Sequence, residues 1–141
     1  MKFALDVRND RKVADDLVDL GERARNAQPL LRAASEVLAG GLARNFRSRG
    51  AELGSPWPAK ADGSPATLHA TGALEAAMTG PFSRTTKTMG IAGARGDSAF
   101  IARFHQGGTK SGVPARKVIG VSRRDESVLL AMVQRYLLSD R

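Results

Sequence analysis

The C-terminal part of the chain carries the pattern that most limits its fold. From residue 122 onward, apolar side chains recur at the three- and four-residue spacing of an α-helix. They form one wide face: Val128, Leu129, Met132, Val133, Tyr136 and Leu137. Ser122 and Asp125 precede this face with the spacing of a capping box at a helix N-terminus. The pattern predicts a terminal amphipathic helix that buries this face against the rest of the protein.

Helical periodicity also predicts helices earlier in the chain. The first, over residues 11–24, has its apolar residues on one face: Val13, Leu17, Leu20 and Ala24. A second begins at Pro29, because proline is favoured in a first helical turn, and an apolar stripe follows it as far as Phe46. Gly50 is typical of a residue that ends a helix. A shorter helix is expected around Leu74 and Met78.

Strand-like patterns occupy the remaining segments. Residues 3–7 alternate between apolar and charged, which predicts a short first strand. Residues 85–91, a turn at 94–97 and a returning segment at 99–104 predict a hairpin. One more strand is expected within residues 113–121, where three side chains should be buried: Val118, Ile119 and Val121. The predicted fold class is therefore α+β, a small, mostly antiparallel sheet with helices packed on one face.

Length and composition indicate an ordinary globular protein. With 141 residues, the chain is expected to form a single domain over residues 1–141. It has no cysteine, which excludes disulfides and thiolate metal sites and is typical of synthesis in a reducing cytoplasm. The first ten residues lack the apolar core of a secretory signal, and no apolar run approaches the roughly 20 residues that cross a bilayer. We expect a cytoplasmically made protein with no membrane partner.

The net charge of +8 has its source in one segment of the chain. Residues 81–124 hold nine of the 22 basic residues but one of the 14 acids, and the other 13 bases and 13 acids balance. Such a segment attracts polyanions or an acidic protein surface. The predicted contacts with DNA or an acidic partner are Arg84, Lys87, Arg95 and Lys110. The alternative is a solvated basic face that serves only solubility.

The residues give no support to catalysis. His69 and His105 are far apart in sequence, and neither has a carboxylate at metal-ligand spacing. No GxSxG motif occurs, and the glycine-rich residues 90–96 lack the spacing and the Lys-Ser/Thr of a phosphate-binding loop. We predict a protein that is not an enzyme and that has no cofactor and no metal.

Four short motifs follow one another over residues 30–138. They are Pro-Trp-Pro at 56–58, L-x-x-T-G-x-L at 68–74, IARFHQGG at 101–108, and VPARKVIG at 113–120 with a serine two residues later. In this order they resemble the phage virion morphogenesis (tail completion) family of Mu-like tailed phages. Ile101 stands where that family often has tyrosine, and Lys117-Val118 replaces its usual proline-aromatic pair.

The resemblance implies a structural protein of the virion. Such a protein completes the tail or joins it to the head, as a ring subunit of the tail-terminator kind at the head–tail junction, or neck. The implied partners are further copies of the chain, in a hexameric homo-oligomer, together with tail-tube and head-connector proteins and DNA in the lumen. A small basic DNA-binding protein is the alternative.

The resemblance also directs attention to particular loop residues. Trp57 would anchor its loop, and residues 105–116 would form an interface or a channel-facing loop. The interface candidates are Trp57, His105, Gln106, Arg116 and Lys117. Bracing of the loop within one chain explains these residue types equally well.

Overall fold

The computed structural model describes residues 10–68, 72–79, 84–91 and 96–138. Their helices are α1 (Asp10–Arg25), α2 (Gln28–Arg47), α3 (Ala73–Thr79), α4 (Gly96–Gly107) and α5 (Arg123–Leu138), with a 3-10 turn, η1 (Ala51–Leu53). Within these ranges the one strand pair is β1 (Arg84–Thr85) with β2 (Gly90–Ile91). The two strands are antiparallel, with Arg84 opposite Ile91.

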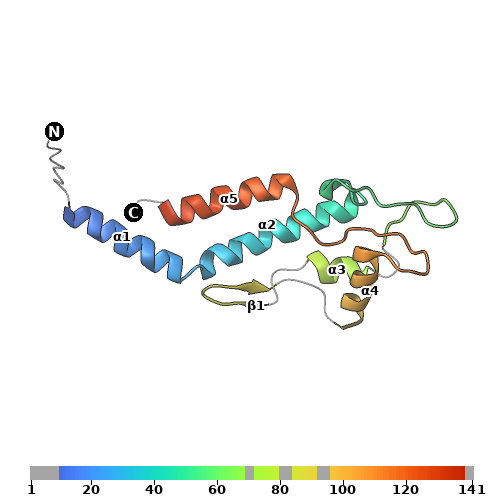
Figure 1. The fold of residues 1–141 in the computed structure, drawn as a ribbon, viewed down its shortest axis with the longest axis horizontal. Coiled ribbons are helices and arrows are strands. Elements are labelled where there is room, and N and C mark those ends of the chain that lie inside the picture. Colours follow the sequence, from blue (N-terminus) through green and yellow to red (C-terminus); the bar gives the residue numbers. More distant parts are fainter. Residues whose placement is uncertain (1–9, 69–71, 80–83, 92–95, 139–141) are drawn as a thin grey trace.

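Helix α2 is the spine of an elongated molecule (Figure 1). Helix α5 runs alongside it, and α1 extends beyond its first turn at one end of the molecule. Helices α3 and α4 lie together on the other side of α2, toward its C-terminal end. The β1–β2 hairpin packs near the start of α2, where the Ala27 N–H donates to the Lys87 carbonyl at 2.7 Å. The two ends of the molecule are therefore built from different elements.

The predicted second helix is confirmed, and its end is fixed by local geometry. Proline lies in its first turn, and Gly50 follows its end with a φ of 92°. A Cβ at Gly50 would come within 2.3 Å of the Ser55 carbonyl oxygen and 2.4 Å of the Trp57 ring. Glycine is therefore required here both by its backbone angle and by the close approach of the following loop.

The apolar core lies at the C-terminal end of α2. Its members are Leu42, Phe46, Trp57, Ala66, Leu74, Met78, Ala102 and Val118. The rings of Phe46 and Trp57 meet edge to face, with centroids 5.4 Å apart, an arrangement that aromatic pairs favour. The core thus joins α2, α3, α4 and the loops between them, while α1 lies outside it.

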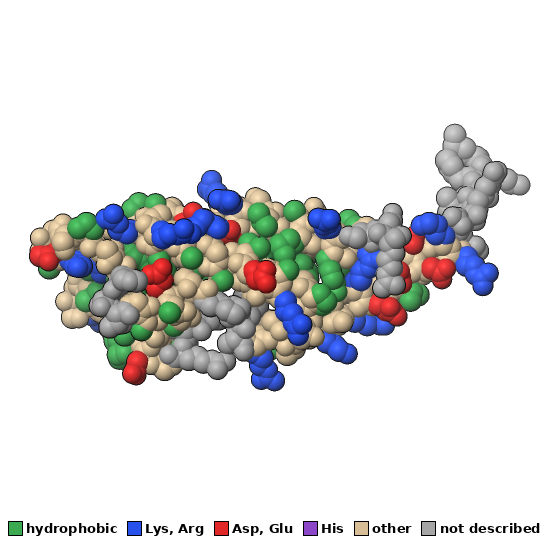
Figure 2. Space-filling model, turned by 180° about the vertical axis from the view of Figure 1, so that it is seen from behind, with side chains coloured by type: hydrophobic (Ala, Val, Ile, Leu, Met, Phe, Trp, Pro, Cys, Tyr) green, Lys and Arg blue, Asp and Glu red, His purple; other side chains and the backbone are tan. Residues whose placement is uncertain are grey.

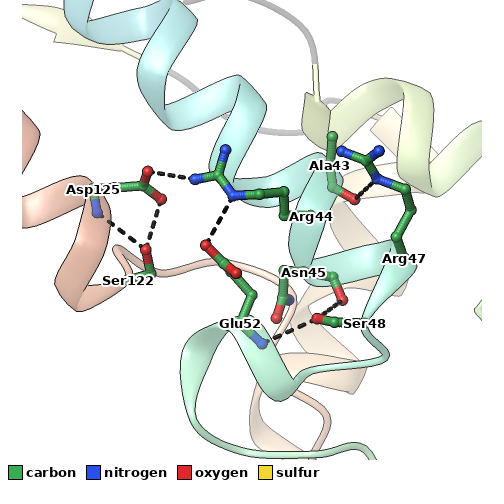
Figure 3. A network of polar contacts seen from close by, with 8 residues as sticks. All are labelled: Ala43, Arg44, Asn45, Arg47, Ser48, Glu52, Ser122 and Asp125. Carbon is green, nitrogen blue, oxygen red and sulfur yellow. Dashed lines mark hydrogen bonds and ion pairs between the residues drawn. The ribbon is translucent and has the colours of Figure 1, made fainter.

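One buried carboxylate fastens α5 to α2 (Figure 3). Asp125, which is 4% exposed, accepts hydrogen bonds from the Arg44 guanidinium and from the Ser122 hydroxyl, the latter at 2.8 Å. The Ser122 hydroxyl in turn accepts the Asp125 N–H at 3.1 Å, so Ser122 caps α5 as predicted. Arg44 also donates to Glu52 of η1 at 2.9 Å, and this hydrogen bond is the main reason that the pKa of Arg44 is raised.

Helix α1 is attached to the far end of α5. Arg23 donates to the Leu137 carbonyl at 3.2 Å, and the Tyr136 hydroxyl donates to the Asn26 carbonyl. The predicted apolar faces of the two helices are only partly buried. Leu129, Met132, Tyr136 and Leu137 are half-buried, whereas Val13, Leu17, Val128 and Val133 are exposed.

The predicted α+β fold class is wrong, because the described chain is mostly helical and has no sheet beyond the two-residue strand pair. The predicted returning strand at 99–104 is part of α4. Alternation of Phe100, Ala102 and Phe104 satisfies a strand, but a helix places the two phenylalanines one turn apart, and their rings meet edge to face at 4.6 Å. Asp97 in the first turn also favours the helix.

Residues 113–121 do not form the predicted strand either. Val118 is fully buried, as expected, but Ile119 and Val121 are exposed. The described hairpin turns at residues 86–89, where the Thr86 N–H donates to the Met89 carbonyl at 2.8 Å. Of the turn predicted at 94–97, residues 96 and 97 begin α4, and residues 94 and 95 lie outside the described residues. The predicted first strand at 3–7 lies outside the described residues.

Gly41 lets α5 approach α2, because an added Cβ would lie 2.1 Å from Asp125 Oδ2. Gly41→Ala is therefore expected to lower the free energy of unfolding by about 1–3 kcal/mol, the usual cost of overpacking. Gly40→Ala is the matched control, since its Cβ would meet only Arg44 Nη1 at 3.5 Å. In urea unfolding, the control should be neutral or gain about 0.5–1 kcal/mol from helix propensity. Equal stability of the two variants would contradict this packing.

Candidate functional site

The sequence-predicted interface residues meet around the irregular segment 113–121. Trp57 is buried, and its indole N–H donates to the Lys117 carbonyl at 3.0 Å. Asn45 of α2 is fully buried and donates to the same carbonyl at 2.9 Å. The Lys117 side chain itself is exposed. Two buried donors thus hold the backbone of this segment against the core, which suits the predicted role of Trp57 as a loop anchor.

Gln106 holds the next two residues of the segment. Its Oε1 accepts the N–H groups of Val118 at 2.9 Å and of Ile119 at 3.0 Å, and its Nε2 donates to the Ile119 carbonyl at 3.0 Å. A side-chain amide has both donors and an acceptor, so it can pair with backbone as another peptide group would. Gln106 therefore supplies the hydrogen bonds that a neighbouring strand would supply in a sheet.

Arg116 is a buried cation that pairs with backbone. It is 7% exposed, and its Nε and Nη2 donate to the carbonyls of Pro58 and Ala59, each at 3.1 Å. Among the described residues no carboxylate lies within ion-pair distance of its guanidinium. These two bonds use only part of the five N–H donors of a guanidinium. Arg116 fixes the loop that carries Trp57 and keeps donors for a further acceptor.

His105 and Arg116 line a cavity of about 410 Å³ between α3, α4 and the loop at residues 60–68. Lys60 is a further basic residue of its lining, Leu74 and Ile101 are among the apolar ones, and no acid is among the described residues that line it. Nδ1 of His105 is buried and has no hydrogen-bond partner in the described structure. Burial, and then the positive charge of Arg116, lower the pKa of His105. The cavity is thus lined by both basic and apolar side chains.

Backbone strain occurs at the same cavity. Leu68 lines it and has a φ of 53°, in the left-handed region that residues with a Cβ seldom adopt. Strained backbone of this kind concentrates at ligand- and partner-binding sites. The strain directs attention to this cavity as the candidate site.

Of the four basic residues predicted to contact DNA or an acidic partner, the three that the structure describes are not among the lining residues of this cavity. Arg84 and Lys87 are exposed on the β1–β2 hairpin near the start of α2, and Lys110 is exposed on the loop after α4, toward the other end of the molecule (Figure 1). Arg95 lies outside the described residues. Figure 2 shows Lys and Arg side chains spread along the molecule with Asp and Glu among them.

In the described ranges, no group of three or more His, Cys, Asp or Glu side chains is placed to hold a metal ion. No helix in the same ranges has the length and apolar character needed to cross a membrane.

Sequence reasoning missed the residues that join α2 to the rest of the molecule. Asn45 lies within an apolar stripe, between Leu42 and Phe46, and a polar residue at such a position is a signal of a buried hydrogen bond. Gly41 lies inside a helix, where glycine is unfavourable, and such a glycine is a signal that another element approaches closely. Neither signal identifies the residue that is contacted, which in both cases lies 72 or more positions away in the sequence.

The protein is mostly helical, and the polar residues predicted to lie at an interface hold its own loops in place. Its sequence matches the phage virion morphogenesis family over residues 8–138, and the chain belongs to that family. No curated protein and no solved structure matches it. The resemblance carried by the four motifs is thereby confirmed, and the protein's role lies in building the phage particle. Membership agrees with a structural role and not a catalytic one.

Arg116→Lys tests the bracing of the Pro-Trp-Pro loop. Lysine keeps the charge but cannot direct two donors at two carbonyls. We expect the free energy of unfolding to fall by about 2 kcal/mol, the scale of lost hydrogen bonds to a buried charge. The fluorescence of Trp57, the one tryptophan, should report a looser environment. Lys110→Ala, on an exposed loop, is the control and should stay within about 0.5 kcal/mol. Wild-type stability of Arg116→Lys would refute the bracing.

His105→Gln tests the burial of the imidazole. Because the folded-state pKa lies below the ordinary 6.5, the unfolded chain takes up the proton more readily. The contribution of His105 to stability is therefore complete above pH 6.5 and is lost as the pH falls below it. The drop in Tm between about pH 7.5 and about pH 5.5 should be smaller in the variant than in the wild type. His69 is present in both proteins and cancels. An unchanged drop would contradict the prediction.

Proposed function

We propose that this protein is a ring subunit at the head–tail junction of a tailed phage, where it completes the tail or joins it to the head. The observation that carries the proposal is the apolar surface left uncovered on α1. Val13, Leu17 and Val18 are 50%, 62% and 60% exposed. A monomer seldom leaves such a strongly amphipathic helix open, and an uncovered apolar patch marks a protein-binding surface.

Helix α5 extends the uncovered surface. Its exposed apolar residues are Val128, Leu130, Val133 and Leu138. Helix α1 has its main packing contact with α5, whose C-terminal end lies beside α1 while its first turn lies beside the later part of α2, so the exposed apolar residues of α5 continue from α1 toward the middle of the molecule (Figure 1). Hydrophobic side chains also gather along the middle of the molecule in Figure 2. This surface supports assembly with further copies of the chain.

The elongated shape favours a ring over a two-fold dimer. The end formed by α1 differs from the end formed by α3 and α4, and unlike surfaces that meet head to tail generate rings when the rotation closes. Six copies is the number that the resemblance to tail terminators implies. Tail-tube and head-connector proteins would bind the two faces of such a ring. Arg84, Lys87 and Lys110 would face DNA in its lumen or acidic surfaces of these neighbours.

A DNA-binding protein that acts alone is the other candidate, and the net charge of +8 favours it. Contact with the DNA backbone would need several Lys or Arg side chains on one face of the protein.

Light scattering during size-exclusion chromatography separates the two functions. We expect a mass that rises to a multiple of 15.0 kDa as the concentration increases from about 1 to about 100 μM.

Electron microscopy is the second arm of this experiment. Gold-labelled antibody to the protein should mark the head–tail junction of intact virions, and purified oligomers should appear as closed rings. A protein that stays monomeric at the highest concentration, is absent from virions and shifts DNA with a steep salt dependence would establish the alternative.

A further inference from the structure

We propose that the cavity between α3 and α4 receives the middle of α1 from a second copy, so that copies join head to tail. The inference rests on the proposed ring and names the contact that would build it. Helix α1 and the helices α3 and α4, which line the cavity, lie at opposite ends of the molecule (Figure 1), so a copy cannot fill its own cavity with its own α1.

The inserting surface combines apolar and acidic side chains. Residues 15–22 of α1 hold four acids and no base. Leu17 and Val18 are exposed, and Asp15 and Glu22 lie one helical turn from Val18 on either side. Neither acid has an ion pair within the described residues. The middle of α1 therefore offers aliphatic side chains flanked by unpaired carboxylates.

The receiving surface is its complement. Lys60 and Arg116 bring positive charge to the cavity, and Arg116 is a buried guanidinium with donors to spare and no carboxylate partner among the described residues. Leu74 and Ile101 are among its apolar lining residues. At about 410 Å³ the cavity exceeds the roughly 150 Å³ that accepts benzene, so a leucine side chain and a neighbouring carboxylate fit.

A second copy satisfies both the basic and the apolar lining residues, which other occupants do not. A DNA phosphate would meet the basic side chains and leave the apolar ones in contact with water, and an uncharged apolar ligand would leave the remaining donors of Arg116 without an acceptor. An acidic and apolar helix satisfies both, and α1 is such a helix in the chain itself. Each copy then uses two unlike surfaces, and repetition with rotation closes a ring.

Two single variants test the contact in the full-length protein. Leu17→Asp changes the inserting surface and Lys60→Glu the receiving one, and both side chains are exposed, so both variants should keep the wild-type Tm. Each is expected to raise the dissociation constant for self-association at least about tenfold. A mixture should form a one-to-one dimer and nothing larger, because each variant keeps the surface that the other lacks. Self-association of both variants at wild-type strength, or no pairing in the mixture, would overturn the contact.

Cross-linking provides an independent measurement, because the chain has no cysteine. A double variant, Val18→Cys with Ser98→Cys at the cavity wall, should form intermolecular disulfides under mild oxidation and give a ladder of covalent oligomers. Val133→Cys with Ser98→Cys is the control, since Val133 is an exposed apolar residue of α5 outside the proposed contact. Wild-type rings with no ladder from the first pair would reject this contact and leave the ring intact. A wild-type protein that never associates would reject both.

Discussion

The structure depends on the insertion of one carboxylate, Asp125, between α5 and α2. Burial of a charged side chain is costly unless it is paired and hydrogen-bonded, and Arg44 and Ser122 meet both conditions. Gly41 leaves the space that the carboxylate occupies. Because α1 packs mainly on α5, the position of α1 depends in part on this attachment. A change at Asp125 would therefore move the whole uncovered end of the molecule.

A second constraint is a set of hydrogen bonds from side chains, which take the place of the predicted sheet. Residues 113–121 are held by side chains, with Asn45 and Trp57 on the Lys117 carbonyl and Gln106 on the two residues that follow. Buried backbone groups need partners, and here those partners come from α2, α4 and the Pro-Trp-Pro loop. The motif residues of the family are thus explained first by how they hold a loop. Arg116, which is buried, also keeps donors for a partner outside its own loop.

Local signals account for what could be predicted. The helices at 10–25, 28–47 and 123–138 follow from apolar periodicity, a proline near one start and a serine cap at another. The strand expected at 99–104 failed because alternation over six residues is also compatible with a helix that buries little. The strand predicted within residues 113–121 is wrong because the conformation of this segment is set by hydrogen bonds to residues 12 to 72 positions away. The motifs identified the family, but no local pattern could bring His105, Lys60 and Arg116 to one cavity.

We propose above all that this subunit is completed by other copies of itself. Hydrogen–deuterium exchange, read by mass spectrometry on dilute and assembled protein, tests it most directly. The amides of α1 should exchange quickly in the monomer and slowly in the assembly, while those of α2, at the core, stay protected in both. Equal exchange of α1 in the two states would contradict the claim, because α1 would then remain uncovered after assembly.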